Sequence, residues 1–228
     1  MVMKLYLDAG HGGKDSGASG NGLLEKNLNL DICKRIKNYL AIYENVEVMT
    51  SRDSDIYLTL DERTDKANKW GATVFLSVHI NANTSPSPRG FETYTYPNID
   101  SATRAFQNVM HEEIFRQISS YGIPDKGKKQ ANFHVLRESQ MKAILTENGF
   151  ISNSADAALF KMPEYLHRLA LGHVIGLEKF FGLKKARPPS EVGLYQVIAG
   201  TFGQKENAND LAKKLMADGY DAYVFKKE

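Results

Sequence analysis

Residues 4–13 read KLYLDAGHGG. The apolar run from Lys4 to Asp8 predicts a buried strand, and the glycines after it predict a loop whose backbone can approach a ligand closely. From Glu25 to Tyr43 apolar residues recur at helical spacing, so we expect a helix that packs on this strand. His11, within the glycine loop, is therefore well placed for chemistry.

The chain continues as strands that alternate with helices. The expected strands are 46–50, 73–78, 91–96 and 141–146. The expected helices are 59–70, which Thr59 caps, 102–121 and 163–181. Such alternation predicts an α/β fold with an open, mostly parallel sheet and helices on both faces.

The composition is that of an ordinary globular protein of 228 residues, with 42% hydrophobic and 25% charged residues. The 29 basic and 27 acidic residues give a net charge of only +2, which lacks the concentrated basic footprint of a nucleic-acid-binding protein. The single cysteine, Cys33, cannot form an internal disulfide, and we expect it to be buried in the first helix.

The N-terminal apolar stretch is too short for a signal peptide or a membrane span, because Asp8 and Gly10 soon interrupt it. We therefore expect synthesis in the cytoplasm without a signal peptide. Activity outside the cell would then require release of the protein by another route.

Two histidines and one glutamate form a candidate metal site. His11 and His79 each follow a strand, and Glu25 begins the first long helix, so all three are expected at the edge where strand carboxyl ends meet. Catalytic zinc commonly uses three such ligands and leaves a fourth position for water. The spacing follows no local ligand motif, so structural roles in a turn, a helix cap and a strand end stay open.

Five blocks of sequence add a resemblance to this pattern. In order along the chain they resemble the blocks of the family 3 N-acetylmuramoyl-L-alanine amidases, over the region from the N-terminus to about Phe181. The blocks are LDAGHGGKDSGA at 7–18, LEKNLNL at 24–30, LSVHINAN at 76–83, GFETY at 90–94 and LTENGFISN at 145–153.

The resemblance implies an enzyme with one zinc ion per chain. It implies that His11, Glu25 and His79 hold the zinc and that Glu147 is the catalytic carboxylate. The implied reaction is hydrolysis of the amide between N-acetylmuramic acid and L-alanine in bacterial peptidoglycan. Amide hydrolysis needs an activated water and a proton for the leaving amine, and zinc with a nearby carboxylate can supply both.

Three further residues are weaker candidates for substrate binding or for orienting the ligands. Asn81 could orient His79 or hold substrate, and Arg137 could meet a peptide carboxylate. An exposed structural role is an equal alternative for both. Glu92 lies in one of the five blocks and could act only as a cross-strand neighbour. The remaining histidines lack a partner pattern and are interpreted as structural: His111, His134, His167 and His173.

The C-terminal part is predicted to be separate. We expect a catalytic domain at 1–182, a linker at 183–193 rich in proline and charge, and a small βαβ half-module at 194–228. Within the half-module we expect strands at 194–199 and 220–225 and a helix at 206–218 that Gly219 caps. The half-module is similar to the first half of a SPOR domain, which implies binding to peptidoglycan glycan. Three readings stay open: a shortened chain, pairing of half-modules between two copies, or docking on the catalytic domain.

Two other functional classes remain as alternatives. One is a wall-binding or regulatory protein that does not cleave, and the other is a different metallohydrolase, such as a polysaccharide deacetylase or carboxypeptidase. The complete set of candidate ligands together with Glu147 favours the amidase. As an endolysin or autolysin, it would reach the wall through a phage pore or after lysis of a mother cell.

Overall fold

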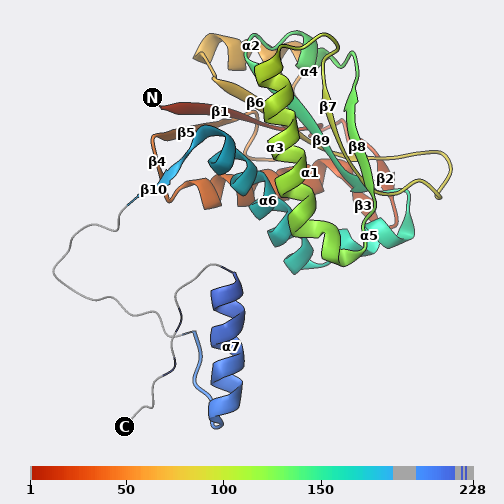
Figure 1. Cartoon of the computed structure of the whole chain (residues 1–228). Coiled ribbons are helices and arrows are strands. Elements are labelled where there is room, and N and C mark those ends of the chain that lie inside the picture. Colours follow the sequence, from red (N-terminus) through yellow and green to blue (C-terminus); the bar gives the residue numbers. More distant parts are fainter. Residues whose placement is uncertain (1, 187–198, 219–221, 223, 225–228) are drawn as a thin grey trace. The chain divides into compact units, whose positions relative to one another are not determined.

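The computed structural model describes residues 2–186, 199–218, 222 and 224. The chain divides into two compact units, Met1–Ala186 and Arg187–Glu228 (Figure 1). The first unit contains the sheet and six α-helices within its described residues, whereas the described part of the second contains one helix. No helix in these described parts has the length and apolar character needed to cross a membrane.

A six-stranded sheet forms the centre of the first unit, in the order β5-β1-β6-β9-β7-β8. Strands β5, β1, β6 and β9 are parallel, β7 is antiparallel to β9, and β8 is parallel to β7. The predicted fold class, an open and mostly parallel α/β sheet, is therefore confirmed. The strands are β1 (Met3–Ala9), β5 (Val46–Thr50), β6 (Val74–Asn81), β7 (Phe91–Thr95), β8 (Asp125–Gln130) and β9 (Lys142–Phe150).

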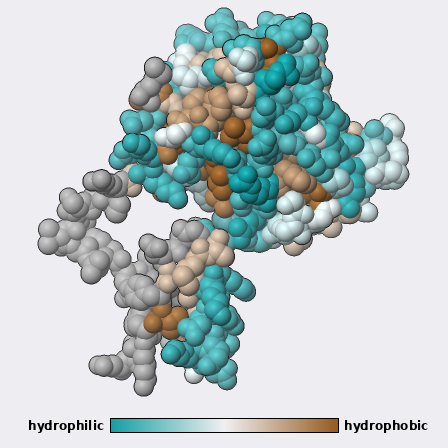
Figure 2. All heavy atoms as spheres, viewed as in Figure 1, coloured by the Kyte–Doolittle hydropathy of each residue, from teal (hydrophilic) through white to brown (hydrophobic). Residues whose placement is uncertain are grey.

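Helices cover both faces of the sheet, as predicted. One face is covered by α1 (Glu25–Leu40), α3 (Ser101–Ile118) and α6 (Pro163–Phe181), and the other by α2 (Leu60–Trp70) and α4 (His134–Arg137). Thr59 and Glu62 form a reciprocal capping box at the start of α2, which confirms the expected cap. Figure 2 shows the first unit from the side on which α3 lies, where the surface is largely hydrophilic with some hydrophobic patches.

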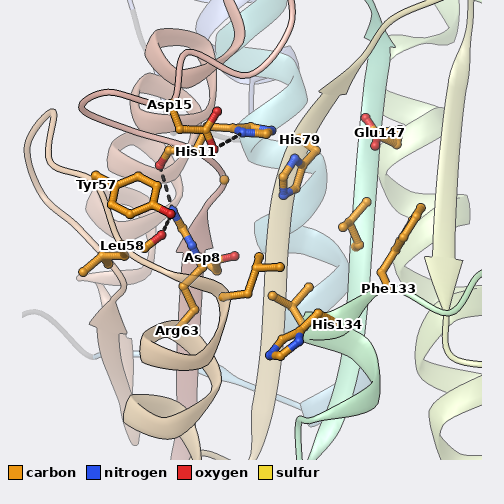
Figure 3. Close-up of a pocket in the computed structure, with 14 residues that line it drawn as sticks. Asp8, His11, Asp15, Tyr57, Leu58, Arg63, His79, Phe133, His134 and Glu147 are labelled. Atoms are coloured by element: carbon orange, nitrogen blue, oxygen red, sulfur yellow. Dashed lines mark hydrogen bonds and ion pairs between the residues drawn. The ribbon is translucent and has the colours of Figure 1, made fainter.

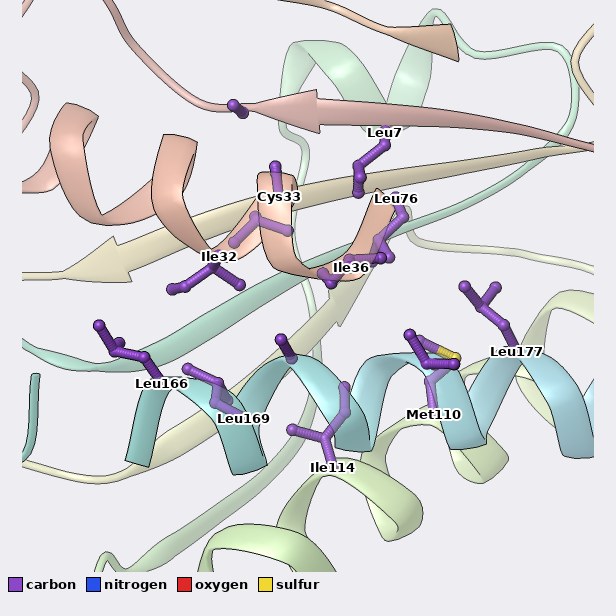
Figure 4. Packing of buried hydrophobic residues seen from close by; sticks show 14 of the residues in the cluster. Leu7, Ile32, Cys33, Ile36, Leu76, Met110, Ile114, Leu166, Leu169 and Leu177 are labelled. Carbon is purple, nitrogen blue, oxygen red and sulfur yellow. The ribbon is translucent and has the colours of Figure 1, made fainter. Parts of the chain in front are cut away.

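The alternation of side chains along the strands produces two cores. Leu7 and Leu76 point toward α1 and α6, where Ile32, Ile36 and Leu169 complete the larger core (Figure 4). Tyr6 and Phe75, their neighbours in sequence, point to the opposite face and stack with ring centroids 5.4 Å apart. Both faces of the central strands are therefore buried, as expected for parallel strands.

Several boundaries differ from the sequence predictions. α1 ends at Leu40, because Tyr43 belongs to β4 (Tyr43–Glu44), which pairs with β10 (Lys184–Lys185). α3 ends at Ile118 and continues as a 3-10 turn, η1 (Ser119–Tyr121). β9 extends to Phe150, so Glu147 lies within a strand and not at its end.

Other elements were not predicted. β8 reads DKGKKQ and carries no alternation of apolar residues, because it is a partly exposed edge strand. α4 has only four residues, too few for a periodic signal. The remaining unpredicted elements are β2 (Ser19–Gly20), β3 (Leu23–Leu24), β4, β10 and α5 (Ser154–Phe160).

The predicted linker and half-module are described only in part. Leu183 packs on the larger core and the backbone nitrogen of Ala186 donates to Ile42, so the first residues of the expected linker belong to the first unit. In the second unit α7 (Lys205–Ala217) matches the helix expected at 206–218. The strands expected at 194–199 and 220–225, and the cap expected at 219, lie wholly or mostly outside the described residues.

Gly172 of α6 permits close packing against α3. A Cβ at this position would lie 2.7 Å from the Cα of Ile114, whereas one at Gly176 would first meet the Sδ of Met110, also at 2.7 Å. A backbone atom cannot move aside as a flexible methionine can. Alanine has the higher helix propensity, but its methyl group would overpack the interface between α6 and α3. We therefore expect Gly172→Ala to lower the free energy of unfolding by about 2 kcal/mol.

Urea denaturation of Gly172→Ala and Gly176→Ala, compared with the unchanged protein, measures this effect. The Gly176 variant should lose less stability. An equal loss, or a gain at Gly172, would contradict the proposed packing constraint.

Candidate functional site

Three side chains that were predicted as metal ligands come together at the carboxyl end of the sheet. His11 lies in the loop after β1, Glu25 is the first residue of α1, and His79 lies near the end of β6. Each offers a ligand atom, and these atoms lie within 4.8 Å of one another. Residues distant in sequence are therefore close enough to hold one ion.

The Glu25 carboxylate lies between the two imidazoles. Its Oε1 is 2.9 Å from His79 Nδ1, and its Oε2 is 3.2 Å from His11 Nε2. The backbone nitrogens of Ala18 and Ile80 also donate to it, at 2.8 and 3.1 Å. Burial alone would raise the pKa of Glu25, but the hydrogen bonds and charges of both histidines outweigh it and hold the pKa well below its usual range.

The backbone around these side chains fits a metal centre. A Cβ on Gly10 would lie 2.2 Å from the His79 ring, and one on Gly17 would lie 2.5 Å from Glu25 Oε2. Two imidazoles and an ionised carboxylate form a donor set that suits a divalent zinc ion. The residues therefore fit the cofactor that the resemblance implies.

Asp15 fixes the orientation of His11. Its Oδ2 is 2.8 Å from His11 Nδ1, while its Oδ1 accepts a hydrogen bond from the backbone nitrogen of Gly17 at 3.0 Å. His11 Nε2 is thereby turned toward Glu25, as in metal sites where a carboxylate holds the second imidazole nitrogen. Asp15 was not predicted as a site residue, although its place four residues after His11 in the same sequence block was an available signal.

Two buried arginines hold the loop that carries His11. Arg63 Nη1 donates to Asp8 at 2.6 Å and to the carbonyl of Ala9 at 2.9 Å, and its Nη2 donates to the carbonyl of His11 at 2.9 Å. Arg52 Nη2 donates to the carbonyl of Gly10 at 3.0 Å. Sequence reasoning missed both arginines, because most of their partners are backbone carbonyls that leave no mark in the sequence.

Glu147 lies beside the candidate ligands on the next strand. In the sheet it pairs in register with His79 of β6 on one side and with Glu92 of β7 on the other. Its Oε2 is buried and has no hydrogen-bond partner among the described residues. Burial, with the charges of Glu25 and Glu92, raises the pKa of Glu147 well above its ordinary value, so this carboxyl is suited to taking up a proton.

Glu92 is engaged by its neighbours. It is buried, and Lys129 Nζ and the Tyr94 hydroxyl donate to it at 2.8 and 2.5 Å. Asn81 Nδ2 lies 3.5 Å from Glu92, which is the limit of a hydrogen bond. Glu92 is therefore a charged neighbour of Glu147, and neither it nor Asn81 lines the cavity described below.

Arg137 also does not line the cavity. Its guanidinium donates to Asn132 at 2.6 Å and to Glu138 at 2.7 Å, both near it in sequence. His134, interpreted from sequence as structural, does line the cavity, and its Nε2 lies 3.1 Å from Asp61 Oδ1 of α2. The position of His134 on the cavity could not be predicted, because the four residues of α4 are too few for a periodic signal.

A cavity of about 270 Å³ opens beside the ligands (Figure 3). His11, His79 and Glu147 line one side of it. The segment that leads into α2 and the segment that leads into α4 line the rest. Much of its wall is apolar. The apolar lining residues are Tyr57, Leu58, Leu60, Phe133, Val135 and Leu145.

Comparison with solved structures agrees with the fold of the first unit. The catalytic domain of CwlV, an N-acetylmuramoyl-L-alanine amidase from Bacillus (Paenibacillus) polymyxa var. colistinus, superposes with a TM-score of 0.75 at 35% identity. The match covers 80% of this chain and 100% of that one. The amidase of Clostridium difficile 630 gives a TM-score of 0.75 at 32% identity, over 79% of this chain and 97% of that one.

Two curated relatives match much of the chain. A sporulation-specific N-acetylmuramoyl-L-alanine amidase of Bacillus subtilis (strain 168) is 46% identical over 228 residues, all of this chain and 86% of that protein. The endolysin of Bacillus phage SPP1 is 46% identical over 187 residues, 81% of this chain and 68% of that protein.

Family models assign both parts of the chain. A SPOR domain model matches residues 176–226, which confirms the resemblance of the C-terminal part. The model described as N-acetylmuramoyl-L-alanine amidase matches residues 5–179, most of the chain and the whole of the site. The chain therefore belongs to the N-acetylmuramoyl-L-alanine amidase family.

Proposed function

We propose that this family member is a zinc-dependent hydrolase that cleaves the amide between N-acetylmuramic acid and L-alanine in bacterial peptidoglycan. The observation that carries the proposal is the convergence of His11, Glu25 and His79 beside Glu147, a carboxyl group with a raised pKa. Family membership supplies the substrate class.

We assign separate roles to the side chains of the site. His11, Glu25 and His79 would hold one zinc ion. When bound, the ion would polarise the substrate's carbonyl and lower the pKa of a water. Glu147 takes a proton from the attacking water and delivers it to the leaving nitrogen of L-alanine. Asp15 keeps the His11 ring in place throughout.

The products distinguish this reaction from the alternatives. An amidase releases L-alanine amino termini and leaves the glycan intact, whereas a deacetylase frees sugar amines and a carboxypeptidase shortens the stem. A wall-binding protein without activity releases none of these. Mass analysis of digested walls tests the proposal, and new L-alanine amino termini are the expected result.

The setting and the C-terminal part are also proposals. The relatives named above include a sporulation-specific amidase and a phage endolysin, so we propose action on the wall after mother-cell lysis or passage through a phage pore. We propose that the SPOR-like segment binds peptidoglycan glycan. Pairing of these segments between two copies stays a prediction, since it concerns residues that lie largely outside the described part.

We expect one zinc per chain to be required for cleavage. A strong chelator should abolish activity, and added zinc should restore it. His79→Ala should lower the zinc content measured by plasma mass spectrometry together with activity, because it removes a ligand. His134→Ala is the matched control, since this histidine lines the same cavity outside the ligand cluster and its loss should leave zinc bound. Full activity in metal-free protein would contradict the assignment.

Glu147→Gln tests the proposed base. Glutamine has a similar size but cannot accept the proton, so kcat should fall by at least about 10²-fold while zinc content and thermal stability stay near those of the unchanged protein. Glu138→Gln, at an exposed residue outside the cavity, should retain activity. A Glu147 variant that is inactive because it lacks metal would instead place Glu147 among the ligands.

Truncation tests the division of the chain. We propose that residues 1–186 fold alone and cleave small soluble muropeptides, because the first compact unit ends at Ala186. Removal of the SPOR-like segment should weaken sedimentation with whole walls. Residues 1–181 should melt at a lower temperature than residues 1–186, since they lack Leu183 and the β10–β4 pairing. Equal melting temperatures would show that these contacts contribute nothing.

A further inference from the structure

The cavity extends from the candidate ligands between two apolar walls. Tyr57 and Leu58 lie on the α2 side and Phe133 lies on the α4 side (Figure 3). Leu60, which begins α2, and Val135 of α4 complete the two walls. The close approach of His134 to Asp61, 3.1 Å, links α4 to α2. The two walls therefore belong to neighbouring elements of the first unit.

Two aromatic rings in these walls are exposed but held in place. Phe133 is 38% exposed and Tyr57 is 41% exposed, so each ring still has an apolar face to bury. Phe133 contacts the Tyr94 ring at a centroid distance of 5.3 Å, and the Lys14 ammonium lies 4.4 Å from the Tyr57 ring centroid. Ordered rings lose little entropy when a ligand covers them.

The charges around the cavity distinguish between the two halves of the substrate. Asp8, Asp15, Asp61 and Glu147 are carboxyl residues on its lining or at its edge. Arg63 also lines it, but this guanidinium is already committed to Asp8 and to backbone carbonyls. A stem peptide carries carboxylates, for which the described residues of the lining offer no uncommitted cation, whereas the muramic acid sugar is uncharged once its lactyl group forms the amide.

We propose that this cavity binds the N-acetylmuramic acid ring, with Phe133 and Tyr57 as its apolar contacts, and that the stem peptide lies outside it. The proposal rests on the amidase function and assigns its sugar subsite. One face of a pyranose ring presents C–H groups, which pack on the electron-rich face of an aromatic ring. Phe133 and Tyr57 are thereby residues that determine specificity for the glycan side of the bond.

Two small probes separate sugar binding from catalysis. N-acetylmuramoyl-L-alanyl-D-isoglutamine contains the sugar, and D-lactoyl-L-alanyl-D-isoglutamine has the same scissile amide without it. The unchanged protein should have the higher kcat/KM for the sugar-bearing probe. Phe133→Ala should lower that value by roughly tenfold and leave the lactoyl probe unchanged, because only the sugar contact is lost. Tyr57→Ala should also lower kcat/KM for the sugar-bearing probe and leave that for the lactoyl probe unchanged.

Matched variants control for folding and for the nearby cation. Phe133→Leu keeps an apolar contact with Tyr94 and should fall between the unchanged protein and Phe133→Ala. Ile56→Ala changes a residue that is 48% exposed and adjacent to Tyr57 but does not line the cavity, so the preference for the sugar-bearing probe should be retained. Lys14→Met should also retain it, since Lys14 supports the Tyr57 ring from outside the lining.

Three results would overturn the proposal. An equal loss on both probes in Phe133→Ala would mean that Phe133 does not contact the sugar. If the loss of kcat/KM in Phe133→Ala disappears when the carboxyl of the isoglutamine residue in the probe is amidated, the stem peptide lies in the cavity. Unchanged protein that hydrolyses both probes equally would also exclude a sugar subsite. Failure to release L-alanine amino termini from whole walls is a separate result, which would overturn the amidase function as well.

Discussion

The Glu25 carboxylate is the interaction on which the arrangement of the site depends. It joins the loop after β1 through His11, the end of β6 through His79 and Ile80, and the approach to α1 through Ala18. One buried anion thus fixes three separate segments relative to one another. An uncompensated charge at this depth would be costly, so removal of its partners should disturb both the fold of the loops and the chemistry.

The change of strand direction between β9 and its neighbour β7 in the sheet determines the surroundings of Glu147. Because β7 runs antiparallel to β9, Glu92 is directly opposite Glu147, while parallel β6 places His79 on the other side. Lys129 and Tyr94 hold Glu92 within hydrogen-bonding distance. In the described part of the chain no cation pairs with Glu147, so its raised pKa follows from burial and also from the negative charge that the sheet topology places beside it.

The central strands and long helices could be predicted because both faces of the sheet are buried and each helix has one apolar stripe. The candidate ligands could be placed at one sheet edge by the same reasoning, but their identity as a set depended on the resemblance, since His11, Glu25 and His79 follow no local spacing. Arg63 and the cavity walls could not be predicted. Arg63 mainly bonds backbone carbonyls, and Phe133 lies in a short connection without periodicity.

The pairing of β10 with β4 has a mechanical consequence. Any tension applied to the chain beyond Ala186 first reaches the backbone bond from Ala186 to Ile42 and the two-residue ladder of Lys184 and Lys185. These antiparallel bonds must yield before the pull reaches the last turn of α6, which packs in the larger core. The last described residues of the first unit are therefore held on β4, which follows the C-terminal end of α1, whereas Glu25 begins this helix.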